Sequence, residues 1–166
     1  MKKIETISKL KEICNQLKKR KKTVGLITGV FDILHYQHVE FLSFAKKKVD
    51  MLIVGIECDE NVKLFKGNNR PIFNFNQRFL VLSSLESIDY VFKIPAIKKE
   101  QSDYSDFYKN IIKKIDIDVL IASRAKDGSW VEKKKSAKEL NIKFITYNEK
   151  FNVSSSEIIS RVMFIK

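Results

Sequence analysis

The sequence contains little glycine, proline or cysteine: five, two and two residues, respectively, among 166. Cys14 and Cys58 lie far apart and belong to no paired motif. Together with only two histidines, they do not supply the three or four closely spaced ligands of a zinc site. A disulfide is not expected either, because a reducing compartment keeps thiols free. We expect both cysteines to be inert, partly buried thiols.

The sequence also lacks any run of 18 apolar residues, which excludes a membrane-spanning helix. Charged residues interrupt the segment after the basic start, so no secretory signal is expected, and we predict a cytoplasmic protein without a membrane partner. Apolar residues make up 44% of the chain and charged residues 31%, which excludes disorder as the default. This length predicts a single domain over residues 1–166, with residues 1–22 as a leading helix packed on it.

Basic residues outnumber acidic ones by 32 to 20, which gives a net charge of +12. A polyanion such as nucleic acid is one possible partner for such a chain. Only five of the basic residues are arginines, however, and reading bases favours the planar fork of arginine over lysine. Nucleic-acid binding is therefore not the expected function, whereas the charge suits a site for phosphate groups.

Strand and helix patterns alternate along the whole chain, joined by short connections. Buried strands are predicted at residues 23–28, 51–56, 90–93, 118–122 and 143–147. Amphipathic helices are predicted at about residues 8–19, 37–47, 61–65, 76–84, 105–115 and 131–140, with a last helix that begins within 154–156. This order predicts an α/β fold: a single Rossmann-like domain with a parallel five-stranded sheet flanked by helices. Ligands of such sheets bind beyond the carboxyl ends of the strands.

The two histidines lie in the turn after the first predicted strand, where a helix begins. His35 and His38 are three residues apart, which places both imidazoles on one face of the first helical turn. The free N–H groups and the positive end of the helix dipole lie at the same place, which favours an anion such as a phosphate. The alternative is structural: one histidine caps the helix and the other packs.

A second possible anion site lies at the start of the last helix. Ser154 is the predicted N-cap, and Glu157 is expected to reach back to it in a capping box. Three consecutive hydroxyls and open amides could hold one or two phosphates there, although many helices begin in this way and bind nothing.

A third group of candidate residues is basic and lies in and around the loop after the second predicted strand. Lys63, Lys66 and Arg70 lie in or near this loop, and Arg78 lies in the first turns of the next helix. Such forks and point charges can bind a phosphorylated substrate. The alternative for each is a solvated basic surface.

These motifs, in this order, resemble those of the cytidylyltransferase-like nucleotidyltransferase family over about residues 8–161. The family pattern Gly-x-Phe-Asp-x-x-His-x-Gly-His corresponds here to Gly29, Phe31, Asp32, His35 and His38. The family's Lys-Gly-x-x-Arg-Pro loop, its helical arginine and its late Ser/Thr-rich motif correspond to Lys66, Gly67, Arg70, Pro71, Arg78 and residues 154–159. The leading helix and the loop resemble in particular the adenylyltransferase domain of ADP-heptose synthase, and next glycerol-3-phosphate cytidylyltransferase.

The resemblance implies transfer of a nucleoside monophosphate from ATP or CTP to a small phosphorylated metabolite, such as a sugar phosphate or polyol phosphate, with release of pyrophosphate. It implies Mg²⁺ held mostly by phosphate oxygens and water, with no protein metal site, and a possible homodimer. The implied catalytic residues are His35, His38 and Lys66. The implied nucleotide-binding residues are Gly29, Val30, Phe31, Ser123, Arg124, Ser154, Ser155 and Ser156. The implied substrate-binding residues are Asp32, Gln37, Lys63, Arg70 and Arg78, with Asp32 expected to be a turn-forming hydrogen-bond acceptor rather than a metal ligand.

The chain departs from the family pattern at two places. Gln37 stands where the family has glycine, and its side chain would either crowd the phosphates or donate a hydrogen bond to substrate. Residues 122–127 replace the Gly-Asp or Gly-Gly-Asp that usually follows the fourth strand, although residues 123–130 are still expected to contact the base. Two alternatives therefore stand beside the enzyme: a non-catalytic nucleotide-binding module and a basic nucleic-acid-binding domain.

Overall fold

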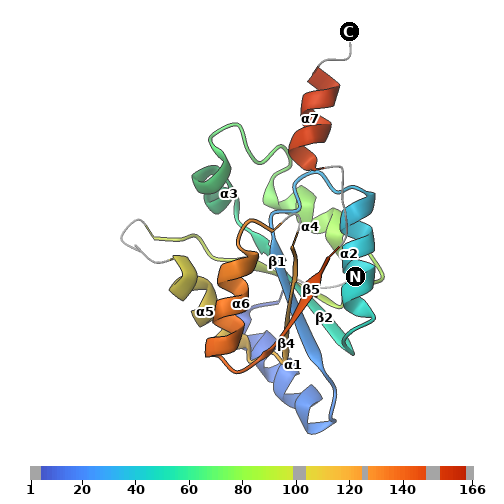
Figure 1. Cartoon of the computed structure of the whole chain (residues 1–166), viewed down its shortest axis with the longest axis vertical. Helices are drawn as coiled ribbons and strands as arrows, with labels where there is room; N and C mark the ends of the chain where they lie inside the picture. The colour runs from blue at the N-terminus through green and yellow to red at the C-terminus, as the bar shows by residue number, and fades with distance from the viewer. Residues whose placement is uncertain (1–4, 99–103, 125–126, 149–153, 164–166) are drawn as a thin grey trace.

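The fold is built on a central sheet of five parallel strands in the order β3-β2-β1-β4-β5 (Figure 1). The computed structural model describes residues 5–98, 104–124, 127–148 and 154–163. The strands are β1 (Val24–Gly29), β2 (Met51–Glu57), β3 (Tyr90–Ile94), β4 (Val119–Ser123) and β5 (Lys143–Tyr147). This order confirms the predicted Rossmann-like α/β domain with its parallel sheet.

Helices follow the strands as the sequence pattern predicts. They are α1 (Ile7–Lys19), α2 (Tyr36–Lys46), α3 (Asp59–Lys66), α4 (Phe75–Ser83), α5 (Tyr104–Ile115), α6 (Trp130–Glu139) and α7 (Ser155–Met163). Local caps explain several of the starts. Thr6 Oγ accepts a hydrogen bond from Lys9 N before α1, and Asn74 forms a capping box with Gln77 before α4. The observed ends differ from the predicted ones by two residues or fewer.

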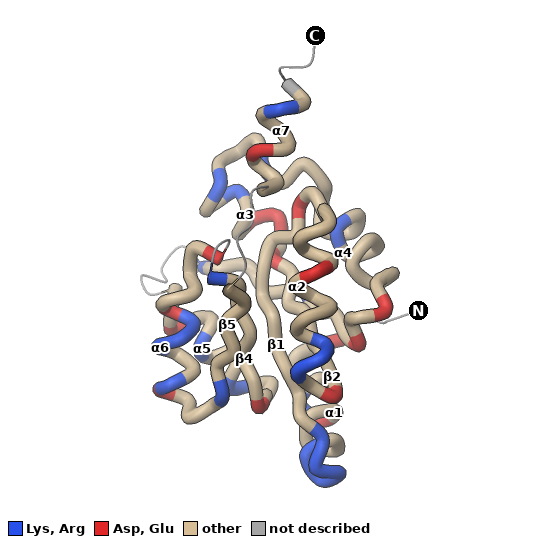
Figure 2. The backbone as a smooth tube through the Cα atoms, turned by 45° about the vertical axis from the view of Figure 1, so that its right-hand side comes forward, with Lys and Arg blue, Asp and Glu red and all other residues tan. Residues whose placement is uncertain are grey.

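The two faces of the sheet are covered by different helices (Figure 2). Phe41 and Leu42 of α2 and Leu82 of α4 belong to the apolar core on one face. Leu10 of α1 and Ile112 of α5 belong to the core on the other face, together with Ala137 of α6. The leading helix is therefore part of this second core, and its residues Leu10 and Cys14 are fully buried.

The strands are apolar on both sides because each side meets a layer of helices. In β2, all seven residues are buried. Its Leu52 and Val54 belong to the α2–α4 core, whereas Met51 and Ile53 belong to the α1–α5–α6 core. This alternation with a period of two residues explains why the sequence shows a continuous apolar run rather than an amphipathic strand.

The carboxyl ends of the strands meet the beginnings of α2 and α7. From β1 the chain crosses to β2 on one side, and from β4 it crosses to β5 on the other side. Neighbouring strands whose connections leave in opposite directions create a crevice between their carboxyl ends. The β1–β4 pair forms this switch point, and α7 extends beyond it, away from the sheet (Figure 1).

Candidate functional site

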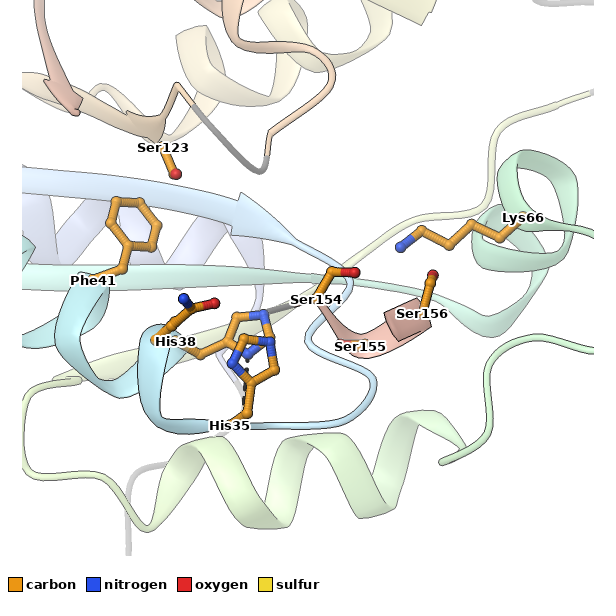
Figure 3. Close-up of a pocket in the computed structure, with 9 residues that line it drawn as sticks. His35, His38, Phe41, Lys66, Ser123, Ser154, Ser155 and Ser156 are labelled. Carbon is orange, nitrogen blue, oxygen red and sulfur yellow. Dashed lines mark hydrogen bonds between the residues drawn. The ribbon is translucent and has the colours of Figure 1, made fainter. Parts of the chain in front are cut away.

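A pocket of about 130 Å³ lies at the switch point, beyond the carboxyl ends of β1 and β4 (Figure 3). Its walls come from α2, the end of α3, the end of β4 and the start of α7. The lining residues are His35, Gln37, His38, Phe41, Lys66, Ser123, Ser154, Ser155 and Ser156. The structure thus brings together residues that lie up to 121 positions apart in the sequence.

The two imidazoles lie against each other at the start of α2. Their ring centroids are 4.0 Å apart, and the His35 backbone N–H donates to His38 Nδ1 at 3.3 Å. His35 is also the N-cap residue of α2, so the structural role considered from the sequence is realised here. Capping does not remove the pair from the pocket, because both histidines line it.

The hydrogen bond to His38 Nδ1 determines which ring nitrogen carries the proton. Because Nδ1 accepts, the proton of the neutral ring resides on Nε2. Burial, together with the smaller effects of the nearby His35 and Lys66, lowers the pKa of His38 to about 4. At neutral pH, His38 is therefore an uncharged imidazole whose Nε2–H can donate a hydrogen bond.

Phe31, in the turn between β1 and α2, packs against His38. Phe31 adopts a left-handed backbone conformation with φ of 52°, which is uncommon for a residue with a side chain. Its ring centroid lies 5.6 Å from that of His38. A Cβ at Gly29 would come within 3.0 Å of Phe31 Cε2, so glycine leaves room for this ring. Gly29 and Phe31 thus support the histidine pair and do not themselves line the pocket.

The serines at the start of α7 form the opposite wall. Ser154 Oγ accepts a hydrogen bond from Glu157 N at 3.2 Å, as an N-cap should. Ser155 Oγ donates to Ile33 O at 3.2 Å, which ties α7 directly to the turn that carries the histidines. The predicted capping box is only half present among the described residues, because the Glu157 carboxylate pairs with Arg161 Nη2 at 2.8 Å instead of reaching back.

Both helix N-termini therefore meet at one pocket. The first N–H groups of a helix have no partners within the helix, and the helix dipole places partial positive charge there. Two such ends, a neutral imidazole donor and the hydroxyls of Ser154 and Ser156 form a concentrated set of hydrogen-bond donors. This arrangement is suited to binding a polyanionic group such as a chain of phosphates.

Lys66 supplies a positive charge from the end of α3, and its amino group points toward the serines (Figure 3). Partial burial lowers the pKa of Lys66, and the nearby Arg70 guanidinium lowers it further. The next residue, Gly67, has a φ of 87°, which ends α3 at this point and which a side chain would strain.

Arg70 and Asp32 form an ion pair behind Lys66, with Arg70 Nη2 2.7 Å from Asp32 Oδ2. Asp32 is buried, and its two oxygens also accept hydrogen bonds from Ile72 N at 3.0 Å and Phe73 N at 2.9 Å. Asp32 thus fixes the loop after α3 to the turn after β1. It acts as the expected hydrogen-bond acceptor and does not line the pocket.

Arg78 lies inside the protein rather than at the pocket, which corrects the substrate contact expected from the sequence. It is 1% exposed and donates to Val30 O, Phe73 O and Glu57 O at 2.7–3.0 Å. Its Nη2 also lies 2.6 Å from Asp59 Oδ1. A guanidinium committed to four protein oxygens joins the ends of β1 and β2 to α3 and α4, and does not grip substrate.

The remaining predicted residues are divided between the pocket and its surroundings. Ser123 and Gln37 line it, whereas Lys63 is an exposed residue outside it. Arg124 is exposed next to Ser123 and stacks over Trp130 at 5.3 Å. Phe41 also lines the pocket, and sequence reasoning missed it because an apolar residue on the buried side of α2 gives no functional signal.

Comparison with known proteins identifies a family and relatives that this chain resembles. The family model for cytidylyltransferase-like proteins matches residues 26–161. The bifunctional protein HldE of Aliarcobacter butzleri is 36% identical over 143 residues, which cover 86% of this chain and 28% of that protein. The bifunctional protein HldE of Campylobacter concisus is 37% identical over 160 residues, which cover 96% of this chain and 31% of that protein. The chain thus spans less than a third of these relatives.

Solved structures share the fold. A lipopolysaccharide core biosynthesis protein from Thermoplasma volcanium has a TM-score of 0.60 at 23% identity, covering 78% of this chain and 99% of its own. A pantoate-beta-alanine ligase from Francisella tularensis, solved with beta-gamma ATP and beta-alanine, has a TM-score of 0.65 at 16% identity, covering 96% of this chain and 76% of its own. Within the described part of the chain, no helix has the length and apolar character needed to cross a membrane.

Proposed function

The chain belongs to the cytidylyltransferase-like family, and we propose that it transfers a nucleoside monophosphate from ATP or CTP to a small phosphorylated metabolite, a sugar phosphate or polyol phosphate. The observation that carries this proposal is the meeting of two helix N-termini, the histidine pair and three serines at one pocket. Both HldE relatives are described as bifunctional, and this chain matches less than a third of each.

The triphosphate lies between α2 and α7 in this proposal. His35 and His38 contact oxygens of the α- and β-phosphates, where negative charge moves as the leaving group departs. The neutral Nε2–H of His38 is fixed by the backbone before the substrate arrives, so little reorganisation is needed. Residues 154–156 and the free amides of α7 hold the β- and γ-phosphates.

The reaction is an in-line substitution at the α-phosphorus. An oxygen of the acceptor's phosphate forms a bond to the α-phosphorus, and the bond to the oxygen bridging the α- and β-phosphates breaks. Pyrophosphate leaves with the electron pair of that bond. The protein contributes position and charge stabilisation rather than a covalent intermediate.

Lys66 and Arg70 bind the acceptor in this proposal. Lys66 reaches into the pocket and bridges the attacking phosphate and the α-phosphate. Arg70 lies close enough to Lys66 that, besides partial burial, its positive charge lowers the pKa of Lys66. The Asp32 carboxylate keeps Arg70 in place next to the pocket-lining Lys66.

Mg²⁺ enters as part of the nucleotide complex in this proposal. Across the residues that the structure describes, no group of three His, Cys, Asp or Glu side chains could hold a metal ion. Asp32 is committed to Arg70 and two backbone amides. The nucleotide's phosphates and water would then bind the ion in this proposal.

Pyrophosphate release tests the proposal. ATP, CTP, GTP and UTP are each incubated with magnesium and a panel of sugar phosphates and polyol phosphates. We expect release with ATP or CTP and at least one acceptor. Tight nucleotide binding without release for any acceptor would contradict the enzyme and favour a non-catalytic nucleotide-binding module.

Two further expectations from the sequence remain predictions. Homodimerisation is tested by measuring the particle mass in solution, and the cytoplasmic location by fractionating cells. Nucleic-acid binding through the lysine surface would give an affinity that falls steeply with salt. A flat salt response would remove that alternative.

A further inference from the structure

The short helix α3, which carries Lys66, has little apolar contact with the rest of the protein. Of its eight residues, only Asn61 and Val62 are buried. Its other apolar residues, Leu64 and Phe65, are 55% and 44% exposed. A helix this short is not stable in water on its own, so contacts outside the helix must hold it in place. A single buried valine supplies little of that contact, which directs attention to the buried amide of Asn61.

The Asn61 side chain binds two other segments of the chain through three hydrogen bonds. Asn61 is 1% exposed, and its Nδ2 donates to Glu57 Oε2 at 2.9 Å and to Pro95 O at 3.0 Å. Its Oδ1 accepts from Ile97 N at 2.9 Å. Glu57 is the last residue of β2, and Pro95 and Ile97 follow β3, which pairs with β2. Asn61 therefore joins α3 to the segments at the carboxyl ends of two neighbouring strands.

Glu57, the partner of Asn61, is also held by a residue of α5. Glu57 is 6% exposed, and its Oε1 accepts a hydrogen bond from Tyr108 Oη at 2.8 Å. Both carboxylate oxygens of Glu57 thus have a donor, one from α3 and one from α5. Moving Asn61 away would leave a buried carboxylate oxygen without its donor, which is unfavourable. The network of Tyr108, Glu57 and Asn61 therefore resists displacement of α3.

The position of Asn61 on α3 determines what this network does for the pocket. Asp59 holds the start of the helix, since it lies 2.6 Å from the Nη2 of Arg78. Lys66 is the last residue of the helix and points its amino group into the pocket, about 7.5 Å along the axis from Asn61 (Figure 3). A helix held only at its start can tilt, and its far end moves most. A displacement of about 1 Å in a group that contacts the reacting atoms can cost about 100-fold in rate.

We propose that Asn61 is a positioning residue for the transfer reaction, because its hydrogen bonds to Glu57 and to the segment after β3 set the place of the Lys66 amino group. This inference rests on the proposed function, in which Lys66 contacts the attacking phosphate and the α-phosphate. Asn61 does not line the pocket, so its effect on the rate passes through α3 and Lys66.

Asn61→Asp tests the hydrogen bonds directly. It keeps the size of the side chain and its acceptor but removes both donors and places a second carboxylate against Glu57. We expect kcat/KM for pyrophosphate release to fall about 10- to 100-fold. The double variant Glu57→Gln/Asn61→Asp exchanges donor and acceptor and should recover at least threefold of that loss. An unchanged kcat/KM in Asn61→Asp, or no recovery in the double variant, would overturn the proposal.

A double-mutant cycle with Lys66→Met separates positioning from a general loss of structure. If Asn61 acts through Lys66, Asn61→Asp should lower kcat/KM by less than about twofold once the amino group is already absent. The same fold-loss with and without Lys66→Met would overturn the proposal, because it would reflect less folded enzyme. Ile112→Val, in the core on the α1–α5–α6 face, is the matched control and should leave kcat/KM within about twofold.

Tyr108→Phe provides a milder change that adds no charge and serves where Asn61→Asp does not fold. It removes only the hydroxyl that holds Glu57 and should lower kcat/KM about three- to tenfold, again only while Lys66 is present. Urea denaturation confirms that each variant is folded under the assay conditions. A rate unchanged by Tyr108→Phe would exclude this residue from the network that positions Lys66.

A measurement that needs no activity keeps this proposal apart from the proposed function. Competitive acetylation, read by peptide mass, gives the pKa of the Lys66 amino group, which partial burial and the Arg70 guanidinium lower in the wild type. Tyr108→Phe should raise that pKa, while labelling of the exposed Lys63 on the same helix stays unchanged. An unchanged pKa of Lys66 would overturn the positioning role. A raised pKa in a protein that releases no pyrophosphate would support the positioning of Lys66 and contradict the proposed reaction.

Discussion

Positive charge gathers at two opposite ends of the molecule, and only one of them has the structure of a binding site. The first is the pocket beyond the carboxyl ends of β1 and β4. The second, here called the basic edge, comprises residues 18–22 and 46–48, all lysine or arginine, at the ends of α1 and α2. Figure 2 shows the blue cluster at the turn after α1, at the far end from α7.

The charges of the basic edge are solvated and partly neutralised. Lys22 lies 2.9 Å from Asp50, and Lys18 lies 2.8 Å from Asp116, with each side chain about one-third to one-half exposed. Such pairs contribute little to stability, because water and salt screen them. Lysines are favoured there because helix C-termini carry partial negative charge.

The pocket has fewer charges but more of its donors are held in place. His38 is neutral, its proton position is set by the His35 backbone, and Ser155 is bonded to the neighbouring turn. In a parallel α/β fold, a helix that follows a strand begins at the carboxyl end of the sheet, as α2 does here, although the C-terminal end of α3 also reaches the pocket. The comparison shows that a high density of positive charge does not identify the binding site. Hydrogen-bond donors that the fold holds in place do.

The largest expected difference is in stability, between removing the buried Arg78 and removing an exposed arginine of the basic edge. Arg78→Ala should lower the free energy of unfolding by about 3–5 kcal/mol, because it leaves Asp59 and three backbone carbonyls without their donor. Arg20→Ala at the basic edge should change it by less than about 0.5 kcal/mol, since Arg20 is exposed. Urea denaturation measures both, and equal losses would contradict the contrast.

The second contrast concerns the histidines. His35→Ala and His38→Ala should each lower turnover by about 10²–10³, the effect of losing one donor to a transition state, or about 3 kcal/mol. Lys19→Ala and Lys21→Ala at the basic edge should leave turnover within about twofold. Initial rates of pyrophosphate release measure the effect, and wild-type rates in both histidine variants would refute the assignment.

Capping and catalysis by His38 can be separated with two replacements. In His38→Asn, the amide oxygen can still accept from His35 N, but the Nε2–H donor is lost. In His38→Gln, the amide nitrogen can approach the position of Nε2, but the cap is lost. We expect the Asn variant to be stable and nearly inactive, and the Gln variant to be less stable but more active. The reverse order of activities would show that His38 acts only as a cap.

The fold could be predicted from the sequence almost completely, and the site in part. Alternating apolar segments predicted the parallel sheet, and that order places the starts of α2 and α7 at one end of it, where residues 35–38 and 154–156 meet. The burial of Arg78 was missed because motif matching assigned it to substrate. A signal was present: Phe75, Arg78 and Leu82 follow helical spacing, and all three are buried.

Other features depend on tertiary contacts that a sequence pattern does not contain. The ion pair of Asp32 with Arg70 joins the turn after β1 to the loop after α3. The position of the Ser123 hydroxyl, which has no partner among the residues that the structure describes, depends on which strand neighbours β1 in the sheet. Neither leaves a periodic trace in the sequence.

A smaller contrast lies within α3 itself. Lys66→Met should lower kcat/KM by about 100-fold, because the proposed contact to both reacting phosphates is lost. Lys63→Met, nearly one turn earlier on the same helix, should change it by less than about twofold, because Lys63 lies outside the pocket. Initial rates are measured at limiting and at saturating acceptor, and the losses in kcat/KM of the two variants are compared. Equal effects would mean that Lys66 contributes only general positive charge.

The smallest expected effect is the pH dependence that His38 gives to stability. Its folded-state pKa of about 4 lies below the ordinary 6.5, so the unfolded chain binds the proton more readily. The stabilisation is therefore complete above pH 6.5 and is lost as the pH falls toward 4. Between pH 7 and 5 the loss should be about 2 kcal/mol. Urea denaturation of the wild type and His38→Asn isolates this contribution, and parallel pH profiles would contradict it.

The most direct test of the whole account is a crystal structure with a non-hydrolysable ATP or CTP analogue and magnesium. The account predicts that the triphosphate lies between the start of α2 and the start of α7, with His35, His38 and residues 154–156 within hydrogen-bond distance of its oxygens. A nucleotide bound at the basic edge, or with its phosphates away from these helix starts, would contradict it.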